Sequence, residues 1–167
     1  MHDDQQLLTW LPRLRRYARA LAGNRDDADD LVQDTLERAW SRSGLWRGVA
    51  DMRAWLFAIM HNLHVDGVRR PRPLTVDLDE DFLEFATPPT QGERLDVLDL
   101  QAALDLLPIE QKEILLLIAL EDMAYADIAA TLGIPIGTVM SRLSRGRERL
   151  RALMEGRATP VRLKVVK

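Results

Sequence analysis

Apolar residues recur at three- and four-residue spacing along two long parts of the chain, which places them on one face of a helix. Neither part shows the strict alternation of a half-buried strand. In the first part, the pattern predicts helices over 7–21, 28–40 and 52–70, with Asp26 or Asp27 capping the second. In the second part, it predicts helices over 95–107 and 109–120, followed by a helical pair over 125–151. The sequence therefore predicts an all-α fold.

The two helical parts are separated by residues 71–94, which contain four prolines, one glycine and a cluster of acidic residues without a sustained helical period. Proline lacks a backbone donor and disfavours helix in the residue before it. We therefore predict two small helical domains, a first module at 1–70 and a second module at 95–155. A flexible acidic linker joins them, and a basic tail follows at 156–167.

The helical pair at 125–151 has the features of a helix-turn-helix. Gly133 suits the left-handed conformation in which a helix often ends, and Pro135 precedes the restart. The second helix carries five arginines opposite its apolar stripe. This layout places the second helix in the major groove of DNA. The alternative, a solvated arginine-rich amphipathic helix, does not account for the turn.

The distribution of charge supports the same interpretation. The chain as a whole has a formal net charge of −3, but the sign varies along it. Residues 95–135 hold one basic side chain against eight acidic ones, whereas residues 136–155 hold five against two. An acidic scaffold behind a basic helix repels DNA except on that helix, and so orients its approach.

The composition of the chain excludes several classes of protein function. The chain has no cysteine, which excludes disulfides, thiolate metal sites and a cysteine nucleophile. It also lacks an apolar run of about 18 residues and a basic N-terminal signal region, so we expect a soluble cytoplasmic protein. We find no nucleophile–base constellation and no glycine-rich phosphate loop, and expect neither catalysis nor a cofactor or small-molecule substrate.

Three motifs in order resemble those of the extracytoplasmic-function (ECF) sigma factors, a family of bacterial transcription initiation subunits. DADDLVQDTLERAW resembles the region 2 segment that binds core RNA polymerase, and DMRAWLFAIMHNLHVDGVRR the helix that engages the −10 promoter element. AYADIAATLG and PIGTVMSRLSRGRERL resemble the supporting and recognition helices of region 4. The resemblance covers nearly the whole chain.

The resemblance implies roles for the first module. The second helix is expected to bind the β′ clamp of core RNA polymerase through a mostly acidic face, and the β flap of the polymerase is a further expected contact. The residues of this face are Asp30, Gln33, Asp34 and Glu37. A −10 pocket is expected to capture an unstacked base, with stacking and hydrogen bonds offsetting the cost of flipping it. Its residues are Arg42, Trp46, Arg47 and Asn62, whereas Trp55 is expected in the core.

In the second module, the recognition helix is expected to read the −35 promoter element. The candidate residues are Tyr125, Gly137, Thr138, Met140, Ser141, Arg142, Ser144, Arg145 and Arg147. Ser141, Ser144 and Arg145 are the best candidates for base contacts, because arginine recognises guanine with two parallel hydrogen bonds. Arg142 and Arg147 are expected to contact the phosphate backbone. Ala124 departs from the family pattern by leaving the supporting helix without a side-chain cap, and Gly146 places a glycine inside the recognition helix.

Three other interpretations stay open at the level of sequence. His61, His64 and Asp66 have a spacing that suits a divalent metal, as in helical metal-dependent phosphohydrolases, although we expect no metal. A sigma-like decoy would titrate an anti-sigma factor without meeting DNA, but would not need an arginine-rich reading helix. A dimeric helix-turn-helix repressor leaves the first module unexplained. The family resemblance also implies an anti-sigma factor as a partner.

Overall fold

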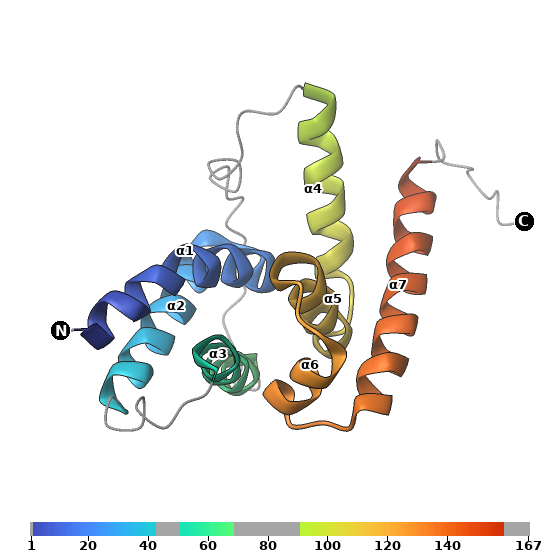
Figure 1. The fold of residues 1–167 in the computed structure, drawn as a ribbon. Coiled ribbons are helices and arrows are strands. Elements are labelled where there is room, and N and C mark those ends of the chain that lie inside the picture. The colour runs from blue at the N-terminus through green and yellow to red at the C-terminus, as the bar shows by residue number, and fades with distance from the viewer. Residues whose placement is uncertain (1, 43–50, 69–90, 159–167) are drawn as a thin grey trace, which may run out of the picture.

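The computed structural model describes residues 2–42, 51–68 and 91–158, and this part of the chain forms helices without strands. In chain order the helices are α1 (His2–Ala22), α2 (Arg25–Ser41), α3 (Met52–Val68), α4 (Gln91–Asp105), α5 (Ile109–Glu121), α6 (Tyr125–Leu132) and α7 (Ile136–Ala158). Helices α1 to α3 pack together, and α5 to α7 form a second group beside them, with α4 projecting from it (Figure 1). The predicted all-α class is confirmed.

A tight turn at Gly23 and Asn24 joins α1 to α2. Gly23 has a φ of 82°, in the left-handed region that favours glycine. The side chain of Asn24 accepts a hydrogen bond from the backbone nitrogen of Asp27 at 2.9 Å, and Asn24 is the N-cap of α2. The prediction that Asp26 or Asp27 caps this helix is therefore wrong. Both aspartates lie in its first turn, where their negative charge interacts favourably with the positive end of the helix dipole.

Helix α3 is buried along more than one face, since both α2 and α6 pack against it. Its Leu56, Phe57, Ile59 and Met60 are all buried, and Trp55 is half-buried against the core, as expected. The ring of Phe57 meets that of Tyr17 of α1 edge to face, with centroids 5.0 Å apart and planes at 82°. These contacts fix α3 between α2 of its own group and α6 of the second group.

Helices α6 and α7 form the predicted helix-turn-helix. Gly133 ends α6 with a φ of 68°, and α7 begins after Pro135, whose carbonyl accepts from the backbone nitrogens of Thr138 and Val139. Ala124 precedes α6 without a side-chain capping bond, as its sequence predicts. Helix α7 continues to Ala158, into the segment predicted as a basic tail, and α4 begins at Gln91, four residues before its predicted start.

Gly146 has a packing role in α7 that its sequence position does not reveal. Although it lies in the middle of a helix, it is buried against α5. A β-carbon at this position would lie 3.3 Å from both Gln111 Cβ and Leu115 Cδ1. Its missing side chain therefore lets α7 approach α5 closely, which offsets the roughly 1 kcal/mol that glycine costs in a helix.

One cluster of buried hydrophobic residues runs through both groups of helices. It includes Leu14, Leu21 and Phe57 from the first group and Ile114 and Leu117 from the second. Helix α1 packs on α5, and α3 packs on α6. The helices of the two predicted modules thus share a core in this structure, while the bounds 1–70 and 95–155 stay predictions.

Candidate nucleic-acid and protein interfaces

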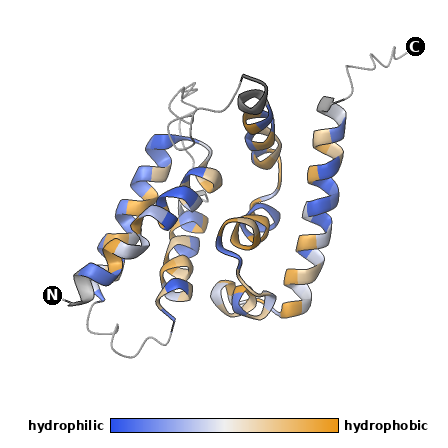
Figure 2. Cartoon of the chain, turned by 45° about the horizontal axis from the view of Figure 1, so that its top comes forward, coloured by the Kyte–Doolittle hydropathy of each residue, from blue (hydrophilic) through white to orange (hydrophobic). Residues whose placement is uncertain are grey.

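Helix α7 turns its apolar stripe inward and a polar, basic face outward (Figure 2). Val139 and Leu143 are buried, and Leu150 is half-buried against the core. We name the outward surface the reading face. Its residues are the exposed side chains Met140, Ser141, Ser144 and Arg145.

The other predicted −35 residues differ in their exposure. Arg147 is exposed, whereas Arg142 and Thr138 are half-buried. Gly137, in the first turn of α7, has no heavy atom within 4 Å of the position that a β-carbon would take. The start of α7 is therefore open on this side, and a nucleic-acid backbone has room to approach it.

A hollow on the surface brings residues of α6 and α7 together. Tyr125, at the start of α6, lines it together with Met140, Ser144 and Arg147, all four of which the sequence identifies as candidate −35 residues. Tyr125 and Met140 are exposed hydrophobic residues, Met140 by 53%. The turn between the two helices thus places an aromatic ring, a hydroxyl and a guanidinium on one side of the molecule.

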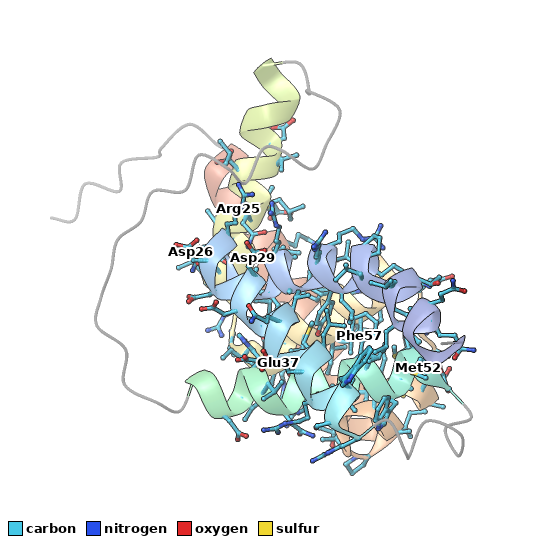
Figure 3. The ribbon with its side chains drawn as sticks, turned by 90° about the vertical axis from the view of Figure 1, so that its left-hand side faces the viewer. Arg25, Asp26, Asp29, Glu37, Met52 and Phe57 are labelled. Atoms are coloured by element: carbon cyan, nitrogen blue, oxygen red, sulfur yellow. The ribbon has the colours of Figure 1, made fainter. Side chains whose placement is uncertain are left out.

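The predicted polymerase-binding residues of α2 form a second exposed surface, which we name the acidic face. Its residues are Asp30, Gln33, Asp34 and Glu37, all of them exposed, and Gln33 donates a hydrogen bond to Glu37 at 3.3 Å. Figure 3 shows Glu37 farther along α2 than Asp26 and Asp29, which lie near its start. Buried residues hold the opposite side of α2 against α1 and α3.

Trp40 is a candidate interface residue that sequence reasoning missed. Its position on the apolar period of α2 indicates a core residue, but its side chain is 54% exposed. It follows Gln33 and Glu37 at helical spacing, on the same side of α2. Exposed aromatic residues are enriched at protein interfaces. The acidic face therefore ends in an aromatic side chain that is more than half exposed.

Only part of the predicted −10 pocket falls within the structure. Arg42 follows α2 as its C-cap, Asn62 lies on α3, and both side chains are exposed. Trp46 and Arg47 lie outside the described residues. The pocket as a whole therefore stays a prediction.

Two carboxylates of α5 are buried against the first group of helices, which the sequence did not predict. Glu113 is 2% exposed and the side chain of Glu121 is fully buried. Burial, together with the negative charges of these two carboxylates, holds the pKa of Tyr17 well above its usual value. Two of the acidic residues counted in the 95–135 scaffold therefore face the protein interior, where they lie beside Arg13 and His61.

His61, from the histidine cluster of α3, contacts one of these two buried carboxylates. His61 Nδ1 lies 2.6 Å from Glu113 Oε1 of α5, a partner distant in sequence. Within the described ranges, histidine and acidic side chains form no group of three that suits a metal ion.

No helix in the described part of the chain combines the length and hydrophobicity of a bilayer span.

Comparison with known proteins identifies the family. Residues 7–61 match the family described as Sigma2 domain of PhyR, and residues 98–150 match Sigma-70, region 4. The chain is 38% identical to the ECF RNA polymerase sigma factor EcfG of Rhodopseudomonas palustris over 155 residues, which cover 92% of this chain and 84% of that protein. The chain belongs to the ECF sigma factors and is a bacterial alternative sigma factor.

Two solved structures share the fold. The sigma factor RpoE of Bartonella quintana, crystallised with the anti-sigma factor NepR, is 32% identical with a TM-score of 0.72, over 91% of this chain and 96% of that one. CnrH in complex with the cytosolic domain of CnrY is 27% identical with a TM-score of 0.69, over 92% of this chain and 88% of that one. Both neighbours were solved in complex with a second protein.

Proposed function

We propose that the chain binds core RNA polymerase through the acidic face of α2 and directs it to promoters that the reading face of α7 selects. A flipped base of the −10 element is held by Arg42, Trp46, Arg47 and Asn62. The β flap of the polymerase contacts the second module. The polymerase makes RNA, and this chain is not itself an enzyme. It acts in the cytoplasm, where polymerase and promoter DNA meet.

The observation that carries this proposal is the composition of the exposed faces. On α7, hydroxyl, thioether and guanidinium groups face outward above a buried apolar stripe, which is the arrangement that a helix in the major groove requires. On α2, the exposed carboxylates suit a basic protein surface and do not suit DNA. The two faces therefore fit two chemically different partners.

An anti-sigma factor is a third proposed partner. Both structural neighbours are complexes with a second protein, one of them named as an anti-sigma factor. In this chain, α4 leaves an apolar surface exposed, and contiguous apolar surface is typical of protein-binding sites. The exposed apolar residues are Val97, Leu98 and Leu100 of α4 and Leu106, which directly follows it. A partner that covers α4 would keep the second module from promoter DNA.

Arg145→Ala tests the reading face. Because a bidentate contact between arginine and guanine contributes about 1–3 kcal/mol of discrimination, the variant should lose about 5- to 150-fold in promoter affinity at one base of the −35 element. On templates mutated at that base, the variant and the natural chain should bind about equally. The measurement is the affinity of the reconstituted holoenzyme for a set of single-base promoter variants.

Arg147→Ala is the matched control, since it removes the same charge from the same helix. Its loss should be similar on every template, and the slope of log affinity against log salt should fall by about one. A uniform loss for Arg145→Ala as well would assign Arg145 to the phosphate backbone and leave base reading to other residues.

A further inference from the structure

Three large hydrophobic side chains of the helix-turn-helix are exposed. Ile136 and Met140 are 49% and 53% exposed and lie one turn apart on α7, so they share a side of that helix. Tyr125, at the start of α6, is 37% exposed and lines the same hollow as Met140. We name these three residues the apolar patch. Exposed hydrophobic side chains that gather in one place indicate a binding surface, whereas scattered ones need no explanation.

The groups around Met140 suit DNA better than an apolar protein surface. Ser141 follows it on α7 and is exposed, and both Ser144 and Arg147 line the hollow beside it. An apolar partner would bury these hydroxyl and guanidinium groups without hydrogen bonds, which costs free energy. The major groove of DNA offers hydrogen-bond acceptors to the same groups. The apolar patch therefore lies within a surface that DNA can satisfy.

The place of the patch on α7 determines which part of the DNA it meets. Ile136 and Met140 are the first and fifth residues of the helix, and the N-terminal residues of a recognition helix contact base edges. Glu148 lines the hollow together with Arg147 and Arg151. Its carboxylate disfavours a phosphate inside the hollow, whereas the two long arginines can reach phosphates at its rim. Met140 therefore faces base edges and not the phosphate backbone.

The base edges of the major groove present one kind of apolar group, the 5-methyl group of thymine. The thioether of methionine is a weak hydrogen-bond acceptor and has no donor, so it gains little from the polar edges of the other bases. Its unbranched side chain adapts to the shape of an apolar neighbour. Contact between Met140 and a thymine methyl removes apolar surface from water on both sides, which is favourable.

We propose that Met140 selects thymine at one position of the −35 element by packing on its 5-methyl group, with Ile136 and Tyr125 as flanking apolar contacts. The inference rests on the proposed function, because it names the base that one residue of the reading face prefers. It complements the role of Arg145, which is expected to recognise the acceptors of guanine. Cytosine is disfavoured beside Met140, because its edge presents an amino group and lacks the methyl.

Deoxyuridine tests this inference without any change to the protein. It pairs with adenine as thymidine does, but it lacks the 5-methyl group. The measurement is the affinity of holoenzyme, reconstituted from the full chain and core polymerase, for promoter duplexes in which each −35 thymine, on either strand, is replaced in turn. Since burial of one methyl group changes affinity by a factor of about four, one replacement should weaken binding about fourfold.

Variants of Met140 assign this effect to its side chain. Met140→Gln keeps the length but introduces a polar amide, so it should bind the thymine template about fourfold more weakly and the deoxyuridine template equally well as the thymine one. Met140→Leu keeps an apolar side chain of similar volume and should retain the sensitivity to deoxyuridine. Arg147→Ala should weaken binding to both templates alike, so the ratio between them should stay at about four.

Equal affinity for every deoxyuridine template would overturn the inference, as would a fourfold loss that persists in Met140→Gln. Unchanged promoter affinity in Met140→Gln would overturn it as well and would leave the apolar patch to a protein partner. Each of these results leaves the proposed function intact. A holoenzyme with no preference for promoter over unrelated DNA would instead refute the proposed function, so the two failures are distinguishable.

Discussion

Reversing two charges on the acidic face, in the variant Asp30→Lys/Asp34→Lys, is expected to weaken binding to core RNA polymerase at least about 100-fold. Both side chains are exposed one turn apart on α2. If they meet a basic surface, the substitution replaces attraction by like-charge contact, which costs several kcal/mol. The helix itself should persist, since lysine is a good helix former. Titration of labelled chain with core polymerase measures the loss.

Asp66→Lys/Glu155→Lys is the control for this variant. Both residues are exposed near the C-terminal ends of their helices, where lysine suits the dipole, and the change in net charge is the same. The control should bind polymerase within about threefold of the parent at physiological salt, where long-range effects of charge are screened. An equal loss in both variants would show that overall charge, and not the acidic face, determines affinity.

Phe57→Ala should destabilise the chain by about 3–5 kcal/mol, a large part of the stability of a domain of this size. Phe57 is 1% exposed and packs edge to face on Tyr17 in the core shared by both groups of helices. Removing the ring leaves a cavity that the surrounding helices fill only partly. Denaturant unfolding followed by circular dichroism measures the loss.

Fluorescence adds a second readout to the same experiment. All four tryptophans lie in residues 1–70, so their emission reports the first module, whereas circular dichroism reports both. With a shared core, the two signals should change together in the parent chain. Leu98→Ala, on the exposed side of α4, is the control and should cost less than about 1 kcal/mol. A small loss for Phe57→Ala would contradict the central place of α3 in the core.

Features set by local chemistry were predictable from the sequence. Gly133 and Pro135 define the turn before α7 because few other residues suit a left-handed helix end followed by a restart. The inward stripe of Val139, Leu143 and Leu150 follows from helical period alone. For the same reason, the candidate residues of the reading face do lie on an outward side of α7.

Features set by tertiary packing were not predictable. Asn24, Asp26 and Asp27 have similar capping chemistry, so the sequence did not decide among them. Trp40 lies at the edge of its apolar stripe, and the period does not say where the stripe ends. From the sequence alone, Gly146 is expected only to destabilise its helix. Its packing role is apparent once the close approach of α5 to α7 is known.

The polar contacts between the two modules could not be inferred because their members are distant in sequence. Glu113 and Lys112 are adjacent in α5, yet each finds its partner in the first module, at His61 and at the end of α1. A helical period shows that a residue lies on the buried side, but not which helix covers it. Charge counts placed these residues in an acidic scaffold, although both are buried.

The most direct test of this account is transcription in vitro from a library of promoter templates, with purified bacterial core polymerase and the full chain. The account predicts defined transcripts that require the chain, from templates that share a −10 element and a −35 element. Their absence above the level of core polymerase alone on every template, with no association between the chain and the polymerase, would contradict it.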